Sequence, residues 1–134
     1  MVGEIRVAIN SDQDIVSARQ KGRVVANELG FSSGDATLIA TAISELARNI
    51  VSYAGKGQII IKMVVNGLNR QGIAVIAADD GPGIADIRQA LRDGFSTSGS
   101  LGLGLPGVRR LMDEFEITSQ PGKGTTVAVK KWRQ

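Results

Sequence analysis

Apolar residues recur along this chain with two different periods, which separate helices from strands. In residues 36–50, apolar side chains return every three or four positions, which predicts a long helix with one buried face. Residues 58–65 are instead apolar and β-branched, which predicts a strand. The same criteria predict strands at residues 4–10, 58–65, 73–78, 115–119 and 125–132, and helices at residues 12–29, 33–54, 85–92 and 105–115.

The resulting element order is β-α-α-β-β-α-loop-α-β-β. Adjacent strands are joined by short polar turns at residues 66–72 and 120–124, so we expect them to pair in antiparallel fashion. A doubly wound sheet needs regular alternation of strands and helices, which this order lacks. We therefore expect one domain, residues 1–134, built as a two-layer α/β sandwich. Its sheet would be mixed and mostly antiparallel, with the helices on one face.

Composition excludes several kinds of chemistry before any motif is considered. The 134 residues include no cysteine and no histidine. Disulfides, thiolate nucleophiles, histidine metal ligands, imidazole bases and phosphohistidine relays are therefore excluded. Acid–base chemistry must depend on Asp, Glu, Lys or Tyr. Glycine, by contrast, is in excess at 17 residues, and nine of these lie between residues 81 and 124, so this segment needs a specific explanation.

The charge pattern does not indicate a nucleic-acid or membrane partner. The net charge is +3, the basic residues are scattered, and there are only one tryptophan and one tyrosine. Proteins that bind single-stranded nucleic acid use a basic stripe interleaved with aromatic residues, which is missing here. No apolar run approaches the ~20 residues of a membrane-spanning helix, and no secretory signal is visible. We expect a cytoplasmic protein.

Glu45 and Asn49 are the first candidate site residues. They lie four positions apart in the predicted helix 33–54, so they share one face, well away from the apolar stripe. The ordinary interpretation is a solvent-exposed helix face. The functional alternative is a magnesium site, because a side-chain amide oxygen suits an ion that keeps several waters, and the neighbouring acid stays free to act as a base.

A second group of candidates follows the predicted strand 73–78. Asp79 precedes Gly81 and Gly83, a pattern that a simple tight turn would also explain. A carboxylate at a strand end can accept a hydrogen bond from an exocyclic amine, and glycines allow a flat base to approach the backbone. Thr125 follows a glycine turn that by itself is an ordinary hairpin turn. In combination with Asp79, its hydroxyl can lie beside the same base.

The glycine-rich segment 99–107 opens the predicted helix 105–115. Free N–H groups at a helix start, together with the helix dipole, form a cradle for anions, whereas the ordinary interpretation is a flexible linker. The glycine spacing at residues 102, 104 and 107 matches the dinucleotide-binding fingerprint in letters only. That fingerprint needs a preceding strand and an acid about 20 residues later, and neither is present.

In this order and spacing, these candidate residues resemble the four motifs of the GHKL superfamily of ATPases and kinases, which has the Bergerat ATP-binding fold. The resemblance covers nearly the whole chain. Residues 42–50, 93–99 and 105–115 are similar to short serine/threonine kinases of the anti-sigma-factor type, and among them to the switch kinases of the stressosome. The matching motifs are the N box (Glu45, Asn49), the G1 box (Asp79, Gly81, Gly83), the G2 box (Gly102, Gly104) and the G3 element (Gly122, Gly124, Thr125).

The resemblance implies a role for each motif. Asn49 would coordinate the magnesium ion that bridges the phosphates of ATP, and Glu45 would be the general base facing the acceptor hydroxyl. Asp79 would bind the adenine amino group, assisted by Thr125. Further contacts to ATP would come from Gly81 and Gly83 on the adenine side and from Gly102, Leu103 and Gly104 at the phosphates, beneath a lid of residues 94–101.

Two positions depart from the pattern of the anti-sigma-factor kinases. Those kinases usually carry a histidine four residues after the N-box asparagine, where this chain has Tyr53. Their lids often hold a basic residue, which is absent from residues 95–101. Both departures favour the switch-kinase subgroup. Arg48 and Lys56 are the alternatives for the cation that assists the γ-phosphate.

The resemblance also implies partners. The protein would use Mg-ATP to phosphorylate serine or threonine on STAS-domain proteins of the stressosome (RsbS and RsbR type). Once released, it would activate a PP2C-type phosphatase (RsbU type). The alternative is an anti-sigma factor that sequesters a sigma subunit and phosphorylates its STAS partner. A gyrase-like motor needs a transducer domain after the ATP domain, and a sensor histidine kinase needs a histidine-bearing helix, so neither is expected.

Overall fold

The computed structural model describes residues 3–83 and 104–134. The predicted helix 85–92, the predicted lid 94–101, Gly102 and Leu103 lie outside these residues. The described elements are, in chain order, β1 (Ile5–Ile9), α1 (Asp12–Glu28), α2 (Ser33–Tyr53), β2 (Gly57–Val65), β3 (Gln71–Asp79), α4 (Gly104–Leu111), β4 (Glu114–Ser119) and β5 (Thr125–Trp132).

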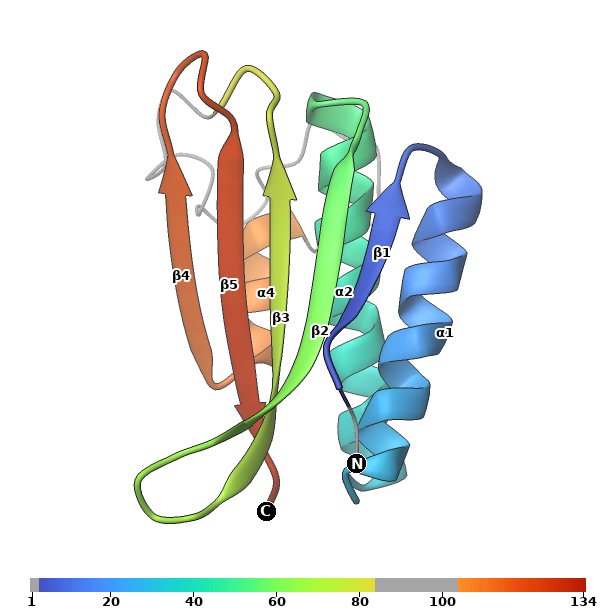
Figure 1. Cartoon of the computed structure of the whole chain (residues 1–134), viewed down its shortest axis with the longest axis vertical. Helices are drawn as coiled ribbons and strands as arrows, with labels where there is room; N and C mark the ends of the chain where they lie inside the picture. Colours follow the sequence, from blue (N-terminus) through green and yellow to red (C-terminus); the bar gives the residue numbers. More distant parts are fainter. Residues whose placement is uncertain (1–2, 84–103) are drawn as a thin grey trace.

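The five strands form one sheet in the order β1-β2-β3-β5-β4. Helices α1, α2 and α4 cover one face of this sheet, and no helix of the described segments covers the other (Figure 1). The predicted two-layer α/β sandwich is therefore confirmed. The sequence predicted a mixed, mostly antiparallel sheet, whereas all four pairings between these strands are antiparallel. The reason is that the β4–β5 hairpin brings β5 back alongside β3 in the opposite direction.

The helix boundaries follow the capping residues that the sequence offers. Ser11 precedes α1 as its N-cap, and the Ser32 side chain caps α2 by accepting a hydrogen bond from the backbone N–H of Asp35 (3.1 Å). Gly30 and Gly55 follow the two helices with φ angles of +86° and +82°. Because glycine adopts this left-handed conformation without steric cost, these residues end the helices where the sequence predicted.

The last helix ends earlier than predicted. The sequence predicted a helix over residues 105–115, but α4 ends at Leu111 and β4 already begins at Glu114. Phe115 pairs with Val129 on β5 and packs against the hydrophobic core. Strand pairing and burial outweigh the helical spacing in this segment, because intrinsic helix propensity is worth only tenths of a kcal/mol per residue.

Helix α2 is the central element of the helical layer, where it packs against both α1 and α4. Its apolar stripe, which includes Ile39, Ile43 and Ile50, is almost completely buried. Burial of each such side chain stabilises the fold by roughly 1.5–3 kcal/mol, so the core determines how α2 is rotated about its axis. That rotation in turn determines where Glu45 and Asn49 lie.

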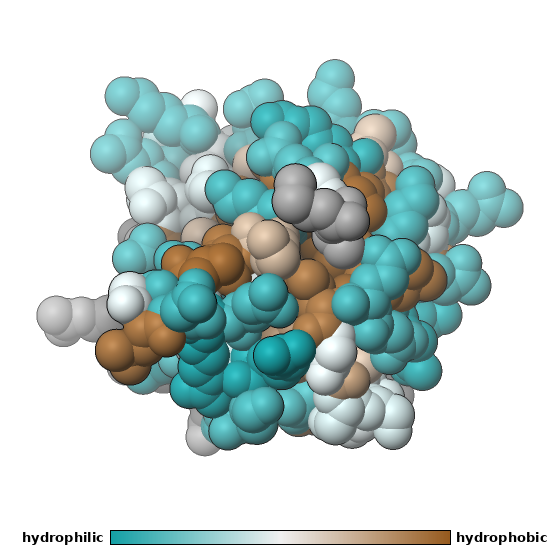
Figure 2. Space-filling view, turned by 60° about the horizontal axis from the view of Figure 1, so that its bottom comes forward, coloured by the Kyte–Doolittle hydropathy of each residue, from teal (hydrophilic) through white to brown (hydrophobic). Residues whose placement is uncertain are grey.

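The β2–β3 hairpin extends past the neighbouring strands at the end of the molecule where the chain terminates (Figure 1). Its tip carries Leu68, whose surface is 88% exposed. At this end, hydrophobic residues form separate patches between hydrophilic ones (Figure 2). None of the helices in the described ranges is long and apolar enough to cross a membrane.

Candidate functional site

The sheet register brings Asp79 and Thr125 side by side, at the end of the sheet opposite the tip of the β2–β3 hairpin. Asp79, the last residue of β3, is the Cα partner of Thr125 on β5 and of Gly57 on β2. Side chains alternate between the two faces of a strand, so residues two positions apart lie on the same face. Asp79 is two residues after the buried Ala77, and Thr125 is two residues before the buried Val127. Both side chains therefore lie on the helix-covered face, together, as the sequence predicted.

The carboxylate of Asp79 is oriented by the turn that follows it. Its Oδ1 accepts a hydrogen bond from the backbone N–H of Gly81 at 2.9 Å. Its Oδ2 forms no hydrogen bond or ion pair with any residue in the described ranges. One oxygen thus holds the side chain in place, and the other can accept a hydrogen bond from a ligand.

Ser119 belongs to the same end of the sheet, and the sequence did not predict it. It is the Cα partner of Thr125, and the two hydroxyl oxygens lie 2.8 Å apart in a hydrogen bond. Ser119 also donates to the carbonyl oxygen of Gly124 (3.1 Å). The available signal was the hairpin itself, because a turn over residues 120–124 places positions 119 and 125 opposite each other.

The glycines of this region have a role within the protein that the sequence did not predict. A methyl group at Gly81 would press on Ala54, at the end of α2, and one at Gly83 would overlap the backbone carbonyl of Gln120. One at Gly124 would overlap the carbonyl oxygen of Asp79. These glycines allow the three loops to approach one another, which a predicted role at the surface of a flat base does not require.

Replacing Gly124 by alanine is expected to destabilise the fold by about 2–4 kcal/mol, because a positive φ (+82°) and an overlap with the Asp79 backbone act together. Gly122→Ala is the matched control. Gly122 also has a positive φ (+78°), but a methyl group there meets nothing within 4 Å, so only about 1–2 kcal/mol is expected. Urea unfolding of both variants measures the difference, and equal losses would contradict the contact.

Glu45 is buried, so a solvent-exposed face is the wrong interpretation for this residue. Its surface is 6% exposed. The guanidinium Nη1 of Arg48, one turn further along α2, lies 3.7 Å from its Oε1. At this distance the two side chains form an ion pair, but the two atoms are too far apart for a hydrogen bond. A buried carboxylate with a cation at its outer side is an unusual arrangement for a helix surface and favours the functional alternative.

Asn49 lies one turn beyond Glu45 and is half-buried. Its side-chain amide has no hydrogen bond to any of the residues that the structure describes. An amide oxygen in this state is available as a ligand for a hard cation, so the residue fits the predicted magnesium role. Tyr53, a further turn along, is 44% exposed at the end of α2.

The end of α2 packs against the strand ends that carry Asp79. A methyl group on Gly57 would meet Ile50 of α2 at 2.9 Å and the Cβ of Asp79 at 3.1 Å. The N-box helix and the G1 turn are therefore neighbours in space, although the sequence separates them by a whole strand hairpin.

Gly104, a predicted phosphate-binding residue, is the first residue of α4. It is buried, and its φ is +52°.

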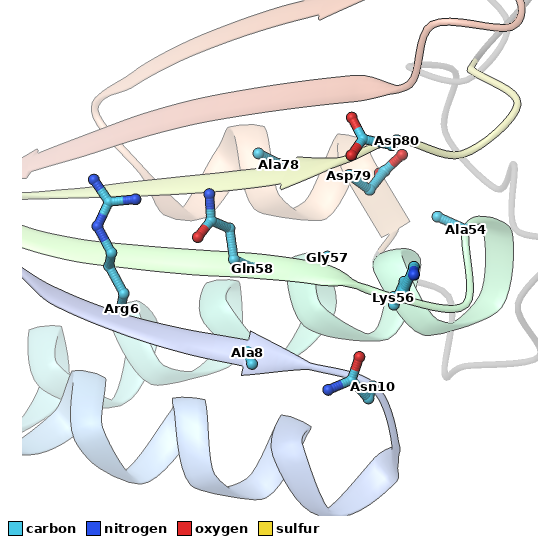
Figure 3. Close-up of a pocket in the computed structure, with 10 residues that line it drawn as sticks. All are labelled: Arg6, Ala8, Asn10, Ala54, Lys56, Gly57, Gln58, Ala78, Asp79 and Asp80. Carbon is cyan, nitrogen blue, oxygen red and sulfur yellow. The ribbon is translucent and has the colours of Figure 1, made fainter.

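A shallow hollow of about 550 Å³ lies at the same end of the sheet, largely on its helix-free side, and Asp79 and Asp80 belong to its lining (Figure 3). Arg6 and Gln58 line it from β1 and β2, and Lys56 lies in the loop before β2. Glu45 is on the opposite side of the sheet, within α2. The structure thus separates the two predicted γ-phosphate cations, because Arg48 lies beside Glu45 whereas Lys56 lies at this hollow.

Comparison with known proteins gives the family. Residues 34–134 match the family model described as histidine kinase-, DNA gyrase B- and HSP90-like ATPase. The chain belongs to this ATPase family. The resemblance to GHKL proteins that the four motifs predicted is therefore confirmed.

Two proteins within this family are similar to the chain over most of its length. The chain is 59% identical over 126 residues to the serine/threonine-protein kinase RsbT of Bacillus subtilis (strain 168), an alignment that covers 94% of each chain. It is 40% identical over 100 residues to the anti-sigma F factor of Thermoanaerobacter sp. (strain X514), with 70% of this chain and 68% of the relative covered.

Among solved structures, the fold is similar to that of the RsbU and RsbW domains of a Mycobacterium tuberculosis protein. The TM-score is 0.65 at 20% sequence identity, and the match covers 99% of this chain and 33% of the other. At this identity the similarity supports the fold alone. It agrees with an antiparallel five-stranded sheet covered by helices on one face.

Proposed function

We propose that the protein is a serine/threonine-protein kinase of the RsbT type, which transfers the γ-phosphate of Mg-ATP to STAS-domain proteins of the RsbS and RsbR type. Once released from them, it activates a PP2C-type phosphatase of the RsbU type. The observation that carries this proposal is the 59% identity to RsbT over 94% of both chains. Such a kinase needs a general base and an adenine site, which the buried Glu45 and the Asp79–Thr125 pair would provide.

Adenine binds at the end of the sheet. The Oδ2 of Asp79 accepts a hydrogen bond from the exocyclic amine, and the Thr125 hydroxyl, held by Ser119, assists. Gly81 and Gly83 line the adenine side. At the phosphates, Gly104 acts together with Gly102, Leu103 and the lid 94–101, which remain predictions from the sequence. A carboxylate that must accept from the amine discriminates against guanine, which has a carbonyl oxygen at that position.

Magnesium supplies neutralisation of the phosphate charge, and the amide oxygen of Asn49 would be its ligand from this chain. Glu45 accepts the proton of the serine or threonine hydroxyl as the new oxygen–phosphorus bond forms and the bond to ADP breaks. Arg48 lies beside Glu45 and is better placed than Lys56 to meet the negative charge of the transferred group. Positioning and electrostatics supply most of the rate, because phosphoryl transfer needs little covalent work from the protein.

The test is to incubate the purified protein with labelled ATP, magnesium and a STAS-domain protein that is encoded near its gene. We expect the STAS protein to be labelled on serine or threonine. A STAS protein in which the labelled serine or threonine is replaced by alanine is the control. Labelling is detected by autoradiography and located by mass spectrometry. Absence of label on every STAS protein offered would contradict the proposal.

The second candidate is an anti-sigma factor, which the 40% identity to the Thermoanaerobacter anti-sigma F factor favours. Such a protein sequesters a sigma subunit and phosphorylates its STAS partner. Co-purification separates the two functions. A sigma factor retained by the protein supports the second candidate, whereas a PP2C-type phosphatase retained in its place supports the first.

A further inference from the structure

The helix-free face of the sheet, which faces the viewer in Figure 1, has an apolar centre. On the central strand β3, the positions that alternate with the buried core residues point towards this face. They are occupied by Gly72, Ala74, Ile76 and Ala78, none of which is polar. An antiparallel strand with one face in water normally carries polar side chains on that face. The sequence of β3 is therefore typical of a strand that is covered on both faces.

The charges on this face are divided between the two edges of the sheet. Cα pairing across the strands defines one row of five residues, which are Arg6 on β1, Ile60 on β2, Ile76 on β3, Ala128 on β5 and Glu116 on β4. The row begins with a cation, continues through three apolar residues and ends with an anion. Its two halves are therefore complementary to each other in charge.

The two charged ends of this row are available for a partner. Arg6 forms an ion pair with Glu4 (2.9 Å), but the two side chains are 59% and 42% exposed, and such exposed pairs contribute little to stability. Glu116 is exposed and forms no hydrogen bond or ion pair with any residue in the described ranges. Neither charge is therefore held firmly within the chain.

A second copy of this chain fits the row in one orientation. A two-fold axis that runs parallel to the strands at β3 would place Arg6 of each copy over Glu116 of the other, with Ile76 over Ile76. An axis across the strands would place Arg6 over Arg6 and Glu116 over Glu116, and like charges repel. The charges thus favour the first orientation, in which the strands of the two sheets are nearly aligned, as they are in β-sandwiches.

The face is large enough for a specific but reversible dimer. Five strands about 4.8 Å apart, with nine residues in β3, offer roughly 500–700 Å² on each copy. Two such faces together approach the lower end of specific interfaces, which bury about 1,200–2,000 Å² in total. One contact is unfavourable, because Lys62 would lie opposite Lys130 of the second copy, although Glu114 beside Lys130 supplies a counter-charge. We therefore expect an exchange between monomer and dimer.

We propose that the helix-free face of the sheet binds a second copy of this chain, in a two-fold dimer in which Arg6 of each copy pairs with Glu116 of the other around an apolar centre at Ile76. Glu45 lies on the other side of the sheet, within α2, so both copies of it would face away from the interface. The inference concerns a surface that the proposed function does not use, and it is independent of that function.

The test measures the Kd of the dimer by sedimentation velocity, with the full chain and without nucleotide. Arg6→Glu and Glu116→Arg are each expected to raise this Kd about tenfold or more, because each change puts two pairs of like charges into the dimer. An equal mixture of the two variants is expected to form a heterodimer with about the Kd of the unaltered chain, because both contacts then join opposite charges again. Two misfolded variants would not recover on mixing.

Arg23→Glu and Glu28→Arg are the matched controls, because they make the same changes of charge at exposed positions of α1. Alone or mixed, they are expected to keep the Kd within about twofold of the unaltered value. A chain that is monomeric at every concentration, an unchanged Kd in Arg6→Glu and Glu116→Arg, no recovery in their mixture, or equal effects in the controls would each overturn the inference. Labelling of a STAS protein tests the kinase function separately, because none of these changes touches Glu45.

Discussion

Replacing Glu45 by glutamine is expected to lower the rate of phosphate transfer about 100-fold or more, while the affinity for ATP changes less than about threefold. Glutamine keeps the size of the side chain in a position that is only 6% exposed, so the fold of α2 is retained. It cannot accept a proton at neutral pH, and loss of a general base typically costs two to four orders of magnitude. Single-turnover phosphorylation of the STAS substrate and titration with ATP measure the two quantities separately.

Glu116→Gln is the matched control for this prediction, because Glu116 is an exposed carboxylate on the edge strand β4. It is expected to leave both the rate and the ATP affinity unchanged. A Glu45→Gln variant that transfers phosphate at the normal rate would remove Glu45 from the role of base. A variant that loses ATP affinity and rate together would assign it to nucleotide binding.

Replacing Asp79 by asparagine is expected to weaken ATP binding about 100-fold, or about 2.7 kcal/mol. The amide oxygen can still accept the hydrogen bond from Gly81 that orients the side chain. The other terminal atom changes from an acceptor to an N–H donor and would then face the donor amine of adenine. The turn therefore survives, and the recognition of the base is lost.

Asp80→Asn provides a control one residue away. Asp80 lines the same hollow as Asp79 but is exposed and lies beyond the last residue of β3, so the same chemical change there is expected to leave ATP affinity intact. Calorimetric titration with ATP and with GTP measures both variants. Unchanged ATP affinity in Asp79→Asn, or an equal loss in Asp80→Asn, would be incompatible with Asp79 as the residue that binds adenine.

Much of the candidate site was predictable because its residues mark the ends of regular elements. Asp79 stands where an apolar strand stops, and Thr125 where the last strand starts. β3 and β5 are not consecutive in the chain, so their pairing does not follow from a short connection; the expectation that Thr125 lies near Asp79 came from the set of motifs taken together. Ser119 was not predicted, because a serine carries no distinctive chemical signal and only its position opposite Thr125 across the 120–124 turn pointed to it.

The burial of Glu45 was not predictable from helical periodicity. Periodicity separates a core-facing stripe from the rest of a helix, and Glu45 lies outside that stripe. Whether the remaining faces meet water depends on what packs beside the helix, and α2 contacts α4 as well as α1. The same dependence on distant partners misplaced the end of α4, where pairing of Phe115 with Val129 decided the structure.

The sequence by itself determined the element order, the helix caps, the family motifs and the absence of histidine and cysteine chemistry. These properties depend on residues close to one another along the chain or on composition. Only the tertiary structure decided that Glu45 is buried, that Lys56 lies at the hollow and not beside Glu45, and that the glycines at positions 81, 83 and 124 allow loops of the protein itself to approach one another. Such relations depend on which faces of which elements meet, and only long-range packing of the core determines that.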